Sequence, residues 1–206
     1  AQYLFQAGRT DEASAALDHA LEFQPGNSQA HWLKGRMFLA AGRNDEAAAE
    51  LRLAERAEPL PEIQWALADA LHAAGREIEA KAVEAKLVAH GATSDPRSFA
   101  LYLATRGVDT SRAVELARRE IELRQDVFTK DALAWALYAD GRIDEAARLQ
   151  AEALAAGTRD ARMYGHAAAI FRAAGRTDDG RSAAAEAERL RHMLLPSETQ
   201  HNQQGG

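Results

Sequence analysis

Cysteine is absent from the 206-residue sequence. The chain therefore has no disulfide, no thiol nucleophile and no zinc–thiolate site. Long apolar runs are also missing, because no stretch approaches the roughly 18 apolar residues that a membrane-spanning helix needs. We therefore expect no membrane span. We expect a soluble protein, cytoplasmic or periplasmic, since these absences leave the compartment open.

A basic excess is lacking as well. Lysine and arginine number 25 against 31 aspartates and glutamates, which gives a net charge of −6. Proteins that bind nucleic acid usually carry a basic patch, whereas the short basic stretches at 118–119 and 189–192 are interleaved with glutamates. We therefore expect no nucleic-acid partner.

Motifs of catalytic chemistry are missing too. The chain contains no Gly-x-Ser-x-Gly elbow, no phosphate loop and no dinucleotide fingerprint. Its seven histidines are scattered, and no two of them stand four residues apart. We therefore predict that the chain is not an enzyme and has no cofactor, no catalytic residue and no metal site.

What the sequence does contain is a turn that recurs at nearly constant intervals. The stretch Ala-Gly-Arg-Thr-Asp-Glu-Ala at 7–13 returns in related forms at 41–47, 74–80, 140–146 and 174–180, and as a degenerate copy at 106–113. A fixed period between 20 and 50 residues indicates stacked structural repeats. The turn glycines are 32 to 34 residues apart: Gly8, Gly42, Gly75, Gly107, Gly141 and Gly175.

Each position in this turn has a physical reason. Glycine can take the left-handed conformation that ends a helix, and the arginine after it suits the negative end of that helix. The next helix is expected to be capped by an aspartate: Asp11, Asp45, Asp144 and Asp178. Small residues lie seven before each glycine and five after it (six after Gly107), as Gly35 and Ala47 do around Gly42, so two helices can approach closely.

This pattern resembles the tetratricopeptide repeat family. The best copy is 28–61, with Trp32, Gly35, Phe38, Gly42, Ala47, Ala54 and Pro59, and the run 131–138 resembles bacterial members. The resemblance implies an all-α, right-handed solenoid of about 5.5–6 antiparallel helix pairs over residues 1–195. We place the repeats at about 1–27 (truncated), 28–60, 61–92, 93–126, 127–160 and 161–195. A polar connection at 92–96, a helix end at Pro196 and a disordered polar tail at 196–206 are also expected.

In this family the first helix of each repeat, the A helix, lines a concave groove. The resemblance implies that the following residues face it: Trp32, Arg36, Trp65, Asp69, His72, Arg97, Thr105, Asp131, Trp135, Tyr138, Arg162, His166 and Arg172. Each tryptophan could equally be a core residue, and the two histidines could be ordinary polar surface. Because acidic residues concentrate on the second, B helices, we predict a scaffold that binds a protein or peptide, preferably an acidic or C-terminal segment.

Two alternatives stay open. The half repeat at the N-terminal end would expose an apolar edge, formed by Tyr3, Leu4 and Phe5, on which a second copy could stack to form a homo-oligomer. The chain could also be a regulatory or targeting segment of a larger enzyme, since Ala1 falls in the middle of a repeat and we expect a piece of a longer protein.

Overall fold

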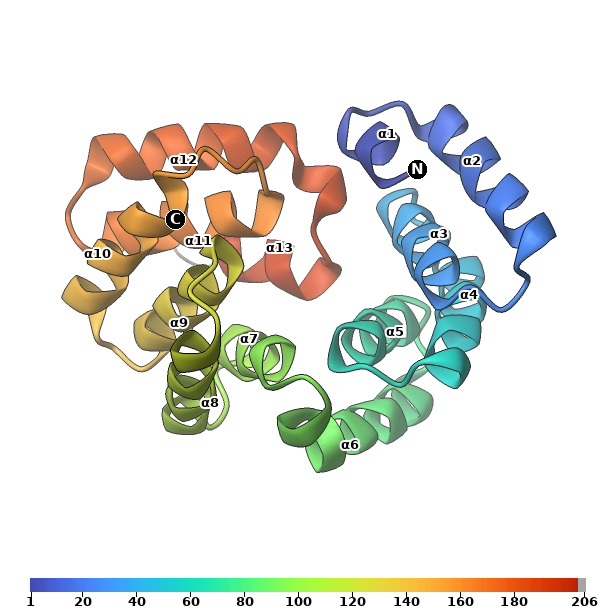
Figure 1. Ribbon diagram of the computed structural model, residues 1–206, viewed down its shortest axis with the longest axis horizontal. Helices are drawn as coiled ribbons and strands as arrows, with labels where there is room; N and C mark the ends of the chain where they lie inside the picture. Colours follow the sequence, from blue (N-terminus) through green and yellow to red (C-terminus); the bar gives the residue numbers. More distant parts are fainter. Residues whose placement is uncertain (204–206) are drawn as a thin grey trace. The chain divides into compact units, whose positions relative to one another are not determined.

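The structure is a computed structural model in which residues 1–203 are described (Figure 1). Within these residues the chain forms thirteen α-helices and one short 3-10 helix, and no strand. The all-α repeat fold predicted from the sequence is thereby confirmed. The chain divides into two compact units, Ala1–His90 and Gly91–Gly206. Each is described by itself, and the single solenoid over 1–195 stays a prediction.

Unit 1 consists of antiparallel helices joined by short turns. From α1 to α5 each helix packs on the next along the chain, and the A helices α3 and α5 also touch each other. Its elements are α1 (Gln2–Gln6), α2 (Thr10–Phe23), α3 (Ser28–Ala40), α4 (Asn44–Ala57), α5 (Pro61–Ala73) and the first part of α6 (Glu77–Ser94).

Unit 2 repeats the arrangement and adds a final segment. The A helices α7, α9 and α11 pack side by side in that order, and each contacts its own B helix. Its elements are α7 (Pro96–Arg106), α8 (Thr110–Leu123), α9 (Val127–Ala139), α10 (Ile143–Leu154), α11 (Ala161–Ala173), α12 (Thr177–Arg189), η1 (Arg191–Met193) and α13 (Pro196–Gln203).

The recurring turn closes each A helix as expected. Gly42 has a φ of +71°, and all six turn glycines are left-handed. After α3, the Arg43 N–H donates to the Phe38 carbonyl at 2.9 Å and the Gly42 N–H donates to the Leu39 carbonyl at 3.0 Å. This pair of hydrogen bonds is the Schellman motif, which satisfies carbonyls that the helix leaves without partners.

The expected aspartate caps are wrong. The N-cap residues of α2, α4, α10 and α12 are the turn arginines, and their side chains make no capping hydrogen bond. Each aspartate lies two residues after the N-cap, inside the first helical turn. Arg43 instead binds the Glu46 carboxylate three residues on and lies 4.3 Å from the centre of the Phe38 ring. The arginine therefore ties the end of one helix to the start of the next.

Small residues allow the paired helices to approach closely. A Cβ added to Gly35 would lie 2.5 Å from Cγ of Leu51 and 3.2 Å from the Ala47 carbonyl oxygen. The alanine five residues after the turn glycine, such as Ala47 or Ala146, is fully buried. The spacing predicted from the sequence thus corresponds to the contact between the A and B helices.

The expected connection at 92–96 is wrong, because α6 continues to Ser94. Gly91 is a helical residue within it, not a helix end. A Cβ there would lie 2.7 Å from the Phe99 ring, which is 5% exposed. Glycine at this position makes room for an aromatic side chain, a role that the sequence alone does not distinguish from helix termination.

The disordered tail is also wrong for the described part of 196–206. Pro196 starts α13 rather than ending α12, in the first-turn position where its missing N–H is no loss. Leu195 is 1% exposed and Glu198 is 5% exposed. Residues 204–206 of the predicted tail lie outside the described residues.

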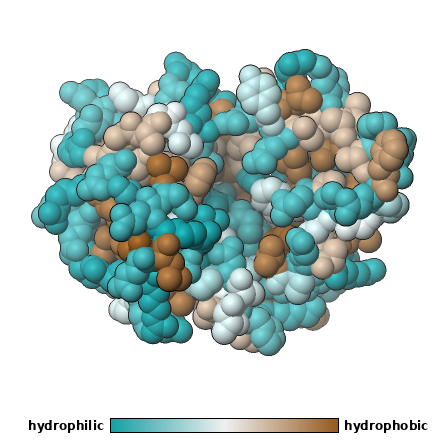
Figure 2. All heavy atoms as spheres, in the orientation of Figure 1, coloured by the Kyte–Doolittle hydropathy of each residue, from teal (hydrophilic) through white to brown (hydrophobic). Residues whose placement is uncertain are grey.

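The expected N-terminal apolar edge is only partly present. Phe5 is 2% exposed and belongs to the core, because α1 packs on α2. Tyr3 remains 76% exposed. Polar side chains cover most of the face seen in Figure 2, with apolar groups scattered between them. Scattered apolar residues are normal on a protein surface, and self-association through this edge stays a prediction.

Candidate partner-binding surface

The A helices of unit 1 bring one of the predicted pairs together. Trp32 and Arg36 lie one turn apart on α3, and the Arg36 guanidinium is 4.8 Å from the centre of the Trp32 ring. Both side chains are half-buried. The indole N–H of Trp32 is buried and has no hydrogen-bond partner among the described residues. Trp32 and Arg36 therefore form a partly exposed aromatic–cation pair.

Two other predicted residues of unit 1 are buried instead. Trp65 is 0% exposed and Asp69 is 3% exposed, both on α5. Of the two readings left open for the tryptophans, the core reading holds for Trp65. A groove position in the repeat pattern does not ensure exposure, because the elements around each repeat differ.

His72, at the end of α5, is held by carboxylates of its own repeat. Its Nδ1 lies 3.0 Å from Oε2 of Glu77, and its Nε2 lies 3.2 Å from Oε1 of Glu84. Burial lowers the pKa of His72, but these two hydrogen bonds and the negative charges outweigh it, so that the pKa is raised. The His72 imidazole thus links α5 to α6 through these two carboxylates.

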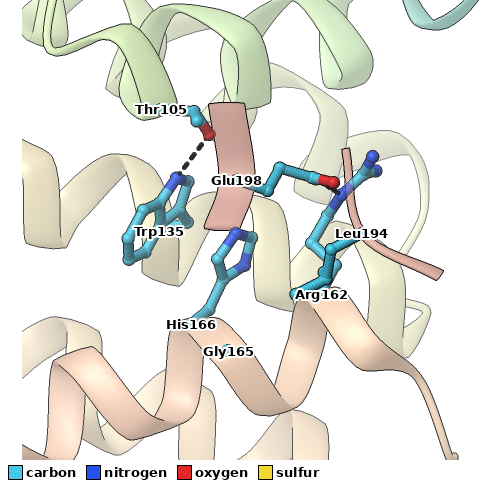
Figure 3. A pocket seen from close by; sticks show the side chains of 7 residues that line it. All are labelled: Thr105, Trp135, Arg162, Gly165, His166, Leu194 and Glu198. Carbon is cyan, nitrogen blue, oxygen red and sulfur yellow. Dashed lines mark hydrogen bonds and ion pairs between the residues drawn. The ribbon is translucent and has the colours of Figure 1, made fainter. Parts of the chain in front are cut away.

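In unit 2 the predicted residues Thr105, Trp135 and His166 meet across three A helices (Figure 3). The Trp135 indole N–H donates to Oγ1 of Thr105 at 3.0 Å. The Trp135 ring stacks on that of His166 with centroids 4.1 Å apart, and on that of Tyr138 at 5.0 Å. Trp135 is 1% exposed, whereas Tyr138 is half-buried. These contacts link α7, α9 and α11.

Asp131 stabilises the same cluster through two hydrogen bonds. Its Oδ1 accepts from Nε2 of Gln150 at 2.9 Å, and its Oδ2 lies 2.9 Å from Nδ1 of His166. Gln150 also donates to the Met163 carbonyl at 3.1 Å. His166 is 5% exposed, so the reading of it as an ordinary surface residue is wrong. A polar network of this kind specifies how adjacent repeats pack.

The predicted arginines of unit 2 differ in exposure. Arg172 is exposed in the last turn of α11, and Arg97 is half-buried near the start of α7. Burial raises the pKa of Asp126, but the Thr129 hydrogen bonds and the charges of Arg97 and Arg124 outweigh it and lower that pKa. Arg97 therefore already acts on a carboxylate.

A carboxylate that the sequence did not single out completes this surface. Glu198, in α13, accepts a hydrogen bond from the Arg162 guanidinium through Oε1 (Figure 3). Its Oε2 accepts from the Leu195 N–H at 2.7 Å. Arg162 and Glu198, together with Thr105, Trp135 and His166, line a cavity of about 10 Å³, which has room for roughly one water molecule. The signal available in the sequence was Pro196 followed two residues later by an acid, which is typical of a helix start.

The described residues contain neither a metal-binding group of side chains nor a membrane-spanning helix. Within 1–203, no three or more histidine, aspartate or glutamate side chains form a group that could hold a metal ion. In the same residues, no helix combines the length and the apolar character needed to cross a bilayer.

Known proteins share the helix-pair fold. A chain of the APC/C hetero-tetramer Cut9–Hcn1 is 14% identical with a TM-score of 0.57, over 91% of this chain and 38% of that one. Human IFIT1, solved as a dimer with PPP-AAAA, is 19% identical with a TM-score of 0.57, over 93% of this chain and 48% of that one. PilW, a type IV pilus biogenesis factor, is 18% identical with a TM-score of 0.51, over 92% of this chain and 93% of that one. A comparison with curated proteins found no match.

The present chain thus spans less than half of two of these structures, and at such identities the likeness concerns the fold alone. The sequence itself carries a family signature, because residues 1–61 match the tetratricopeptide repeat profile. Helix pairs of the same kind, each closed by a left-handed glycine, continue to Arg189. The chain is therefore similar to tetratricopeptide-repeat proteins, in sequence over residues 1–61 and in fold over the remaining helix pairs.

Proposed function

We propose that this chain is a non-enzymatic scaffold that binds a protein or peptide partner on its A helices and prefers an acidic segment. The observation that carries the proposal is the pair between Arg162 and Glu198. In it, an arginine on the A helix α11 binds the carboxylate of a segment from outside the repeats. Arginine presents a planar set of donors that matches a carboxylate. The pair is a working example of the recognition that we propose.

The lysines of the A helices are less suited to this role. Lys34 lies 2.8 Å from the Asp18 carboxylate and Lys130 lies 2.9 Å from that of Glu152, both on neighbouring B helices. Their charges stabilise the packing of repeats. We assign partner binding to four arginines on the A helices, Arg36, Arg97, Arg162 and Arg172, because the planar guanidinium matches a carboxylate better than an ammonium does.

A titration with defined peptides tests the proposal. Two series of fluorescein-labelled peptides of equal length, one rich in glutamate and one in which glutamine replaces glutamate, are titrated and followed by fluorescence polarisation. We expect the glutamate series to bind. Replacing Arg36, Arg97 and Arg172 together by glutamate should weaken binding about tenfold or more, since arginines are frequent hot spots and 1.4 kcal/mol corresponds to a factor of ten.

The control replaces three exposed arginines of B helices by glutamate, namely Arg56, Arg118 and Arg181. It changes the net charge by the same amount and should leave the affinity within about twofold, because distant exposed charges are screened. Circular dichroism verifies that both variants fold. Equal affinity of the A-helix variant and the wild type would contradict the proposal.

A further inference from the structure

The segment after α12 returns to the A-helix side of unit 2. Helix α13 packs on α7 and α11, the two A helices that flank α9, and η1 also packs on α11. Leu195, Ser197 and Glu198 are all at most 9% exposed. This segment therefore covers the surface that contains Trp135 and His166, which a peptide partner of unit 2 would need to reach.

The covering segment has a compact recognition unit, residues 195–198, of sequence Leu-Pro-Ser-Glu. Leu195 is the buried apolar anchor, and Pro196 starts the helix. The Glu198 carboxylate uses one oxygen to accept from the Leu195 N–H and the other to accept from Arg162. The same carboxylate thus stabilises the helix start and attaches it to α11.

We propose that residues 194–198 are an intramolecular ligand that occupies the partner surface of unit 2, and that an external partner binds by displacing them. This inference rests on the proposed function. The partner that fits is a peptide with the same chemistry: an apolar residue, a proline, one further residue and an acidic residue, at the start of a helix.

The attachment has the properties of a displaceable contact. It depends on one ion pair and a few buried side chains, and the Arg162 side chain is 19% exposed to solvent. A ligand tethered by a short connection acts at an effective concentration of the order of millimolar. A site with an intrinsic Kd of about 10 μM would then bind an external peptide about a hundredfold more weakly than the uncovered site.

The first experiment compares full-length variants. A fluorescein-labelled peptide with the sequence of residues 190–203 is titrated against the wild type, Glu198→Gln and Glu188→Gln. Glutamine removes the charge but keeps an oxygen for the Leu195 N–H. We expect Glu198→Gln to bind the peptide at least about tenfold more tightly than the wild type. Glu188→Gln is the matched control, because Glu188 is exposed and faces Arg191, and it should behave as the wild type does.

Adding Arg162→Gln to the Glu198→Gln variant should abolish the gained affinity, because the peptide then has no cation to bind. If Glu198→Gln and the wild type bind the peptide equally, the intramolecular ligand is refuted while the scaffold function stands. If the glutamate-rich peptides described above and this peptide all fail to bind every variant, both proposals fall.

A second experiment needs no substitution. Hydrogen exchange of the wild-type amides at 195–199 is measured with and without an excess of the unlabelled peptide. Displacement predicts faster exchange at these amides in its presence, with unchanged exchange in α12. Unchanged exchange at 195–199 under conditions where the peptide is bound would overturn the inference, whatever the folding behaviour of the variants.

Discussion

Gly35 gives the sharpest test of how the helix pairs are built, and the variant is Gly35→Ala. Replacing a glycine inside an exposed helix by alanine normally stabilises it by about 1 kcal/mol. Gly35 lies within α3, so helix propensity alone predicts a more stable protein. The packing of α3 on α4 predicts the opposite.

The size of the packing term follows from the neighbours of the added Cβ. It would lie 2.5 Å from Cγ and 2.9 Å from Cδ2 of Leu51, and 3.2 Å from the carbonyl oxygen of Ala47. Leu51 is 0% exposed, so its side chain has no solvent into which it can move. Overpacking of this kind costs about 1–3 kcal/mol. Subtracting the helix gain, we expect Gly35→Ala to destabilise unit 1 by up to about 2 kcal/mol.

Urea denaturation followed by circular dichroism measures the effect, and hydrogen exchange of the α3 and α4 amides locates it. Gly26→Ala is the control, because its added Cβ meets no atom within 4 Å. It should be neutral, or stabilising by up to about 1 kcal/mol through the unfolded state. A Gly35→Ala protein at least as stable as the wild type would refute the reasoning that glycine serves helix approach here.

Three further predictions concern other contacts. Because the pKa of His72 is raised, its two carboxylate contacts stabilise the fold fully below the unfolded pKa of about 6.5, and this stabilisation is lost as pH rises through the folded pKa. His72→Gln should therefore lower the free energy of unfolding more at about pH 6 than at about pH 8.5, as measured by urea titrations. Gly91→Ala should destabilise unit 2 by up to about 2 kcal/mol, because the clash with Phe99 exceeds the gain in helix propensity, and the urea midpoint should fall. Asp131→Ala should cost about 2–4 kcal/mol, because buried donors of Gln150 and His166 lose their acceptor, and thermal unfolding should show it.

The helix boundaries were predictable because they depend on local chemistry that recurs. The left-handed glycine and the buried alanine five residues later act within one turn of chain, so their spacing indicates their role directly. The repeat predicted at 28–60 accordingly begins with α3 at Ser28, and the repeat predicted at 93–126 contains α7 and α8, which end at Arg106 and Leu123. The expected connection at 92–96 was wrong because the role of Gly91 depends on Phe99, which belongs to another helix.

The candidate surface was less predictable, because exposure depends on elements that no repeat pattern specifies. Trp32 and Trp65 occupy the same position of their repeats, yet the first is half-buried and the second fully buried. His166 is buried because Trp135 stacks on it and Asp131 binds it from the preceding repeat. Glu198 belongs to no repeat, so the pattern gave no reason to consider it.

The turn positions were easier to predict than the surface positions, and the reason lies in the repeat architecture. The positions that bring A and B helices together meet the same geometry in every repeat, so one solution, a residue with little or no side chain, serves all of them. The expected groove positions of the A helices meet a different neighbour in each repeat. The five that precede the turn glycine by ten residues accordingly differ in residue type or in burial: Trp32, Trp65, Arg97, Asp131 and Gly165. Selection for a partner can therefore change these positions one by one without disturbing the helix pairs. The same freedom lets a segment such as 194–198 evolve to cover a single repeat surface, because only that surface has to match it.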